Sequence, residues 1–258
     1  MLKLPTLLEM LKAGVHFGHQ TSRWHPKMKE YIFGTRNGIH VIDLEKTSAQ
    51  LEKSLNYAKT LAANGKVVLF VGTKHQARDI VKNSAQNCGM PYLVERWIGG
   101  LLTNFPEVKK RLRKYNELKD QFETGEIERY SKKEQIMLKK KLAKMDKYLV
   151  GLSSLTQMPD ALYITDLRTE KTATTEAMRM GVEILAVTDT NVNPTKANHI
   201  IPANDDAVNS IKMMAELVAE SINQGKMEWE KKQSDLQIAT AKKEVGKKER
   251  KALKKDEG

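Results

Sequence analysis

The stretch AGVHFGHQTSRWHPKMKEYIFGTRNGIHVIDLEKT, residues 13–47, holds four of the six histidines, several cations, a tryptophan and a turn signal. Two apolar runs, residues 31–33 and 39–42, flank a turn that contains Asn37-Gly38. This dipeptide tolerates positive φ at both central turn positions, so the spacing predicts a β-hairpin. The segment is too short to be a domain and is expected to form an arm.

Cationic side chains surround Trp24 ahead of the hairpin. Arg23, Lys27 and Lys29 lie within six residues of it, and Pro26 forbids a continuous helix there. Cations around an aromatic plane suit phosphates together with a stacked base or sugar. A solvated loop in which Trp24 covers the core fits the local sequence equally well.

Four long strings together resemble the bacterial ribosomal protein S2 family. They are residues 13–47, VVLFVGTKHQAR (67–78), RWIGGLLTNF (96–105) and PDALYITDLRTEKTATTEAMRMGVEILAVTDTNVNP (159–194). Their order and spacing are typical of the family, and the resemblance covers about residues 5–225. His25 departs from the pattern, because many relatives are expected to carry Asn there.

The resemblance implies a non-catalytic, structural protein of the small ribosomal subunit. It would sit on the solvent side between head and body, bind 16S rRNA loosely, contact other small-subunit proteins and help to dock the mRNA-binding protein S1. No homo-oligomer, cofactor or small-molecule substrate is expected. Contact with RNA is assigned to Arg23, Trp24, Lys27, Lys29, Arg36, Lys74, Arg78, Arg96, Trp97, Asn104, Lys109, Lys110, Arg111, Arg113 and Lys114.

The charge of the chain is unevenly distributed. The 258 residues carry a formal net charge of +12, which favours a polyanionic partner. Residues 1–106 hold 14 Lys/Arg against 7 Asp/Glu, residues 107–149 hold 14 against 8, and residues 226–258 hold 11 against 7. Residues 150–225 hold only 5 against 10, so this section is better suited to facing proteins.

Cysteine usage and hydropathy indicate the cellular compartment. Cys88 is the only cysteine, which excludes a disulfide or a thiolate zinc site within the chain. No signal segment opens the sequence, and no apolar run approaches the roughly 20 residues needed to span a bilayer. A ribosomal location in the reducing cytoplasm, without a membrane partner, is therefore expected.

Alternating apolar runs and helical patterns predict an α/β core. Strands are expected at residues 67–71, 92–94, 161–165, 184–188 and 200–201. Helices are expected at residues 4–13, 43–64, 75–88, 171–180 and 205–223, with Gly225 beyond the last. Strand–helix alternation requires crossovers, so the expectation is a flavodoxin-like three-layer sandwich with a mainly parallel sheet, built from residues 1–106 and 150–225.

Two further segments flank this core in the sequence. Apolar residues in 107–149 recur at steps of three and four on both sides of Thr124-Gly125, which predicts an inserted antiparallel coiled-coil α-hairpin. Its two helices of about 18 residues would reach ~27 Å. Residues 226–258 are rich in Lys and Glu and poor in core-forming residues, so a basic, largely disordered tail is expected.

A nucleotide-binding α/β enzyme that uses the carboxyl edge of the sheet is the main alternative. Residues 72–75, Asp166 and residues 189–191 follow predicted strands at that edge. However, VGTKHQA lacks the first glycine of a phosphate-binding loop, and neither G-x-G-x-x-G nor G-x-S-x-G occurs. The sequence therefore favours no catalytic residue and no enzyme, while a free RNA-binding regulator is a third possibility.

A metal site is a minor hypothesis. His16 and His19 could combine with Asp189, Asp205 or Asp206. Gly14 and Gly18 weaken the helix that would place both imidazoles on one face, so hydrogen-bonded or RNA-facing histidines are favoured. No metal is expected.

Overall fold

A five-stranded parallel sheet forms the centre of the computed structural model. The structure describes the backbone of residues 4–253 and the side chains of residues 4–235. The strands are β4 (Val68–Val71), β5 (Tyr92–Leu93), β6 (Ala161–Ile164), β7 (Glu183–Thr188) and β8 (His199–Pro202). They are hydrogen-bonded in the order β5-β4-β6-β7-β8, and every pair is parallel. Numbered within the sheet this is the order 2-1-3-4-5, which confirms the flavodoxin-like prediction.

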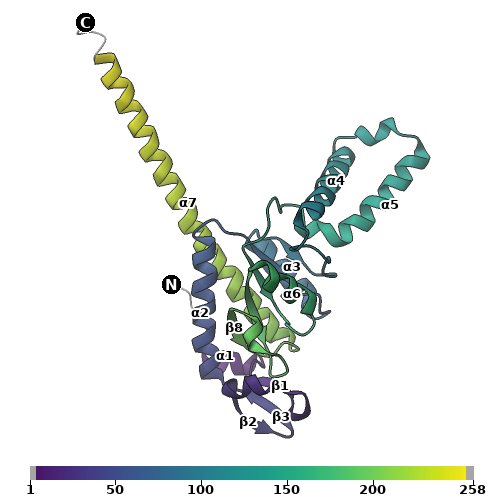
Figure 1. The fold of residues 1–258 in the computed structure, drawn as a ribbon, viewed down its shortest axis with the longest axis vertical. Helices are drawn as coiled ribbons and strands as arrows, with labels where there is room; N and C mark the ends of the chain where they lie inside the picture. The colour runs from purple at the N-terminus through teal and green to yellow at the C-terminus, as the bar shows by residue number, and fades with distance from the viewer. Residues whose placement is uncertain (1–3, 254–258) are drawn as a thin grey trace.

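Helices cover both faces of the sheet, so the core has three layers (Figure 1). Side chains alternate along the strands: Phe70 and Tyr163 belong to one hydrophobic cluster, Leu69 and Leu162 to the other. The first cluster is completed by α2 (Leu44–Ala62), α3 (Arg78–Asn87) and α7 (Val208–Leu253), and the second by α6 (Lys171–Met180) and the base of the inserted hairpin.

The N-terminal arm is a three-stranded antiparallel sheet rather than an isolated hairpin. It follows α1 (Leu7–Lys12) and contains β1 (Phe17–Gln20), β2 (Ile32–Arg36) and β3 (Ile39–Ile42) in the order β1-β3-β2. The predicted hairpin is confirmed, with φ of 52° at Asn37 and 77° at Gly38. The third strand was missed because FGHQ has no β-branched residue and pairs only through the free edge of β3.

The inserted hairpin projects from the core as predicted (Figure 1). It consists of α4 (Phe105–Glu123) and α5 (Lys132–Leu149), and Ser131 caps the start of α5 in a capping box with Glu134. The apolar side of α4 is buried at Val108, Leu112 and Tyr115. The two helices diverge away from the core, and the apolar positions of α5 are mostly half-buried.

Helix α7 continues past Gly225, so the prediction that it ends there is wrong. A Cβ at Gly225 would overlap the carbonyl oxygen of Lys59 and lie 2.8 Å from Cβ of Ala62. This glycine therefore lets α7 pack closely on α2, and it does not cap a helix. The predicted disordered tail is corrected for residues 226–253, which are helical, while residues 254–258 lie outside the described part.

Candidate nucleic-acid interface

The arm presents four exposed cations and the accessible Trp24, and we call this set the arm surface: Arg23, Trp24, Lys27, Lys29 and Arg36. Two short 3-10 helices, Thr21–Arg23 and Pro26–Tyr31, carry most of these residues, and Arg36 ends β2. Within residues 4–235 the side chains of Arg23, Lys29 and Arg36 form no ion pair. Lys27 makes only a long contact, 3.4 Å, with the Thr195 hydroxyl. These cations are free to bind an external anion.

Trp24 both covers the core and remains accessible. Its ring lies 5.4 Å from the ring of the buried His40, yet 37% of the residue is exposed. The neighbouring His25 amide donates to the Thr190 carbonyl oxygen at 2.8 Å, which ties this turn to the core. Both sequence interpretations of Trp24 therefore describe part of its environment.

The loop that leads into the hairpin is held by Glu176 of α6. Its carboxylate accepts hydrogen bonds from Nε1 of Trp97 at 3.0 Å and from the amides of Gly100 and Leu102 at 2.8 and 3.1 Å. The amide and hydroxyl of Thr103 also donate to it. Burial alone raises the pKa of Glu176, but these donors outweigh it and lower that pKa below its usual value.

Trp97 is not placed to stack on a base. Only 7% of it is exposed, and its indole N–H is used by Glu176. The prediction of an RNA contact by Trp97 conflicts with this burial. The role of Glu176 was missed because it lies 79 residues from Trp97 in the sequence and carries no local signal.

The other predicted residues near the hairpin base are mostly exposed. Arg96 lies in the loop, and Asn104 is the N-cap residue of α4. The cations of residues 109–114 do not share one face of α4, because Arg111 and Lys114 line a groove between α4 and α5 whereas Lys109, Lys110 and Arg113 do not. The hairpin thus presents cations in more than one direction.

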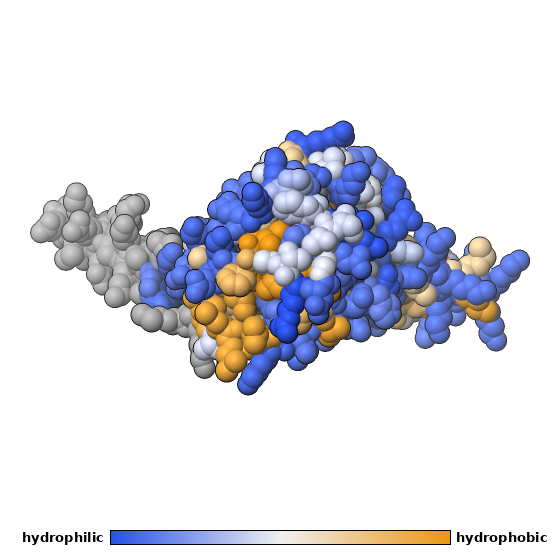
Figure 2. All heavy atoms as spheres, turned by 90° about the horizontal axis from the view of Figure 1, so that it is seen from below, coloured by the Kyte–Doolittle hydropathy of each residue, from blue (hydrophilic) through white to orange (hydrophobic). Residues whose placement is uncertain are grey.

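In Figure 1 the arm lies below the core, and the hairpin projects from the upper part of the core to one side. The core sheet and its helices separate them, so the predicted RNA-contacting residues do not form one continuous patch. Figure 2 views the arm end and shows an apolar area among mostly hydrophilic atoms. Exposed apolar residues of α1 and the arm include Leu7, Leu8, Leu11, Phe17 and Phe33.

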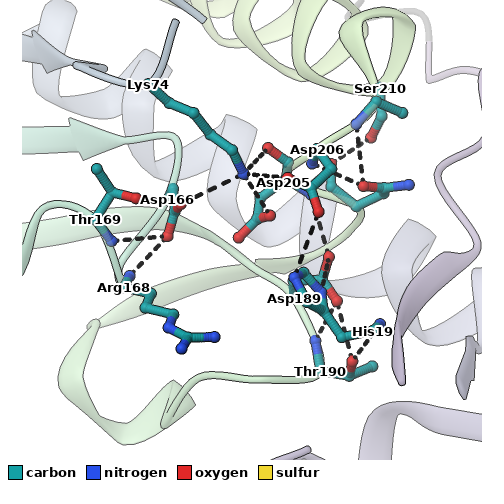
Figure 3. Close-up of polar contacts among 12 residues, drawn as sticks. His19, Lys74, Asp166, Arg168, Thr169, Asp189, Thr190, Asp205, Asp206 and Ser210 are labelled. Atoms are coloured by element: carbon teal, nitrogen blue, oxygen red, sulfur yellow. Dashed lines mark hydrogen bonds and ion pairs between the residues drawn. The ribbon is translucent and has the colours of Figure 1, made fainter. Parts of the chain in front are cut away.

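Lys74 is not part of either cationic surface. Its ammonium lies 2.6 Å from Asp206, 2.9 Å from Asp205 and 3.5 Å from Asp166 (Figure 3). The Lys74 side chain is only 17% exposed, so its charge is used within the protein and the predicted RNA contact is disfavoured. Arg78 is engaged too, since its Nε donates to the Thr73 carbonyl oxygen at 3.0 Å.

The carboxylates around Lys74 outnumber it. Asp166, Asp189 and Asp205 are buried at the carboxyl ends of the strands. Burial, followed by the negative charges of Asp166 and Asp189, raises the pKa of Asp205 to about 7. Asp206 is more exposed, and although burial opposes the effect, Lys74 lowers the pKa of this carboxyl.

His19 joins this cluster from the arm. Its Nδ1 lies 3.1 Å from Oδ2 of Asp189, and its Nε2 lies 3.4 Å from Oδ2 of Asp206. The Asp189 carboxylate is the main cause of the raised pKa of His19, and partial burial opposes it. The His19 amide also donates to the Thr190 hydroxyl at 2.9 Å. The cluster therefore fastens the arm to the core.

The family model for Ribosomal protein S2 matches residues 10–225. The chain belongs to the ribosomal protein S2 family. Its fold and the extent of the match agree with the resemblance seen in the sequence. Membership makes it a ribosomal protein of the small subunit, a component of a ribonucleoprotein that acts in translation. The family is one of ribosomal structural proteins, associated with ribosomal RNA and other ribosomal proteins, and is not an enzyme family.

The carboxyl edge of this S2-family sheet is poorly suited to a nucleotide. The amide of Thr73, at the end of β4, donates to Oε1 of Glu170 at 2.7 Å and is thus already used. The nearby carboxylates of Asp166 and Asp205 would repel a phosphate. The charge and hydrogen bonding of this edge disfavour the nucleotide-binding alternative.

Three side chains of the carboxylate cluster around Lys74 could hold a cation. Among the described residues, donor atoms of His19, Asp205 and Asp206 lie within 4.8 Å of one another, a nitrogen and oxygen set suited to a divalent transition metal. His16 is not in this group and instead lies beside the ring of Phe17. Lys74 already supplies a positive charge to both aspartates.

None of the described helices combines the length and apolarity that a bilayer-spanning segment requires.

Proposed function

We propose that this chain is a structural constituent of the small subunit that binds the 16S rRNA backbone between head and body, through the arm surface and the hairpin base. The observation that carries the proposal is the state of the arm cations. Arg23, Lys29 and Arg36 are exposed and form no ion pair within residues 4–235. Free cations of this kind bind phosphates and release condensed counterions.

The distance between the two cationic surfaces supports a bridging role. The core lies between the arm and the hairpin (Figure 1), so each would meet a different segment of RNA. Helical RNA is recognised by shape and phosphates across its grooves, so these surfaces need no base-specific contacts. Trp24, with 37% of its surface exposed, is the residue best placed to stack on an unpaired base or a sugar.

Charge reversal on the arm tests the RNA contact. The triple variant Lys27→Glu/Lys29→Glu/Arg36→Glu is tagged in its own cells, and its incorporation into small subunits is measured by sucrose-gradient sedimentation in low and high salt. We expect the wild-type protein to co-migrate with 16S rRNA, with incorporation that weakens as salt rises. The variant should be depleted from subunits several-fold in low salt.

A matched control variant distinguishes an effect of the arm position from an effect of the lower net charge. Lys66→Glu/Lys82→Glu/Lys171→Glu changes the charge equally at exposed sites after α2 and on α3 and α6. Its incorporation should match that of the wild type. Unchanged incorporation of the arm variant, or equal loss in the control, would refute the arm assignment, and a wild-type protein that stays free of 16S rRNA would refute the ribosomal role.

The proposal has a second part, which concerns protein partners. In the cytoplasmic ribosome the chain helps to dock the large protein S1 and contacts other small-subunit proteins. Support comes from exposed apolar side chains of α1 and the arm, where Leu8 is 60% and Phe33 80% exposed. Figure 2 shows an apolar area on this end of the molecule. Such a patch marks protein contacts more often than RNA contacts. The variant Leu8→Asp/Phe33→Asp should leave 16S rRNA in the peak and reduce the S1 content of purified subunits; unchanged S1 content would exclude this site.

A further inference from the structure

A groove of about 850 Å³ runs between α4 and α5, from the base of the hairpin towards its tip. Its lining spans Val108 to Gln121 on α4 and Leu138 to Leu149 on α5. At 1.5 Å per residue these segments are about 20 and 16 Å long. The groove is therefore elongated, and its shape fits an extended or helical ligand better than a compact molecule.

Apolar side chains form the floor of the groove. They are left partly uncovered because α4 and α5 diverge. Val108, Leu118 and Leu149 are buried in it, whereas Leu138 and Met145 of α5 are half-buried. The seam pattern of α5 predicts that such residues pack against a partner helix along their whole length. Part of that seam is left open towards solvent.

Cations lie along both walls of the same groove. Arg111 and Lys114 belong to α4, Lys141 and Lys144 to α5, and all four are exposed. Arg96 adds a fifth at the base, and Glu117 is the single acidic residue of the lining. The groove thus combines an apolar floor with positively charged walls.

We propose that this groove binds an amphipathic α-helix of a protein partner, with an apolar stripe against the floor and acidic residues on both flanks. An inserted helix would cover Leu138 and Met145 and bring its carboxylates to the cations of both walls. A phosphate backbone gains nothing from an apolar floor. A second copy of the hairpin is disfavoured, because residues 107–149 hold 14 Lys/Arg against 8 Asp/Glu and would repel one another.

This binding mode goes beyond the RNA contacts proposed above and does not depend on them. It also gives the 109–114 cluster two roles. Arg111 and Lys114 turn to the groove and serve the protein partner, while Lys110 and Arg113 remain available to RNA.

Binding of designed peptides to the full chain tests the proposal. The probe is a fluorescent 18-residue peptide with Leu at helical spacing (i, i+3, i+4, i+7) and Glu on both flanks, titrated by fluorescence anisotropy at physiological salt. One control peptide has the same composition in scrambled order, and a second keeps the Leu stripe but replaces Glu with Lys. We expect the patterned acidic peptide to bind at least tenfold more tightly than either control.

Paired variants locate the site. Lys141→Glu/Lys144→Glu should weaken binding of the acidic peptide at least tenfold, whereas Lys139→Glu/Lys140→Glu, on the same helix but outside the groove, should change it less than twofold. All four lysines are exposed, so neither variant is expected to unfold the hairpin. Equal weakening by the two variants, or no preference for the patterned peptide, would overturn the proposal.

Crosslinking in assembled ribosomes distinguishes protein from RNA. A photoreactive residue at Leu138, in the groove, is compared with one at Lys139, outside it. Crosslinks from position 138 to an acidic, amphipathic helical peptide, above those from position 139, support the proposal. Crosslinks from position 138 to rRNA, or no excess over position 139, overturn it. Sedimentation of the same proteins shows separately whether ribosome incorporation succeeded.

Discussion

The ammonium of Lys74 lies 2.9 Å from Oδ1 of Asp205, a carboxylate that is only 2% exposed. Asp166 and Asp206 also contact this ammonium. A single lysine therefore compensates several carboxylates where the arm, the sheet and the start of α7 meet. Its main role is to hold these elements together.

Replacement of Lys74 by Met should destabilise the protein strongly. The variant leaves Asp166 and Asp205 buried without their counter-charge, which typically costs about 3–5 kcal/mol. Urea unfolding of the purified chain measures this free energy. Lys82→Met on the exposed side of α3 is the control, with an expected change within about 0.5 kcal/mol. A loss below about 1 kcal/mol for Lys74→Met would show that the carboxylates are compensated in another way.

Titration of Asp205 should lower the free energy of unfolding as pH rises from about 4 to about 7. The folded Asp205 carboxyl, with its pKa raised to about 7, keeps a proton that the unfolded carboxyl loses near pH 4. The raised pKa of His19 acts in the same direction, because stability is lost as pH rises through it. Burial lowers the pKa of His16, so this residue makes stability rise with pH. The contribution of Asp205 is therefore measured as the difference in stability between the wild type and a variant that lacks this carboxyl.

Asp205→Asn isolates this contribution. Asn keeps an oxygen that can accept from Lys74 but does not titrate. Between about pH 4 and pH 7, the free energy of unfolding of the wild type relative to the variant should fall by up to about 1.4 kcal/mol per pH unit. Urea unfolding at pH 5, 6, 7 and 8 measures it. Parallel curves for the two proteins would contradict the assignment of the raised pKa.

Loss of the Glu176 carboxylate should loosen the start of the hairpin. Glu176→Ala removes the acceptor for Trp97 and for the amides of Gly100 and Leu102, with an expected cost of about 2–4 kcal/mol. Glu176→Gln should cost less but still leave donors unpaired, since one amide oxygen replaces two. Hydrogen exchange at the Gly100, Leu102 and Thr103 amides should accelerate in both variants. Exchange that stays as slow as in the wild type would mean that the loop holds its shape without Glu176.

Gly225→Ala should destabilise the protein, although alanine is the better helix former. In an open helix this change gains about 1 kcal/mol. Here the new Cβ would overlap the Lys59 carbonyl oxygen, so α7 must shift from α2, at a cost of about 1–3 kcal/mol. Thermal unfolding followed by circular dichroism measures the balance. Ser234→Ala, at an exposed site on α7, should change stability little. A stabilised Gly225→Ala would show that α2 and α7 accommodate the added methyl group without moving apart.

Local sequence patterns determined the elements of this fold. Asn37-Gly38 specified the turn between β2 and β3, because few dipeptides accept positive φ at both positions. The uninterrupted run Val68–Val71 specified a strand buried on both faces, and Ser131 with Glu134 specified the start of α5. Each of these signals depends on backbone torsions or burial within a few residues, so it can be read without the rest of the chain.

Contacts between distant segments decided which predicted site residues are free. Lys74 and Trp97 carry the same local signals as the exposed cations and Trp24, yet Asp205 and Glu176, 131 and 79 residues away, engage them. Gly225 resembles a helix end until α2 packs against it. Sequence by itself determined torsions, periodicity and charge. Only tertiary packing decided which polar group meets which, because partners so far apart in the chain are brought together by the layers of the fold.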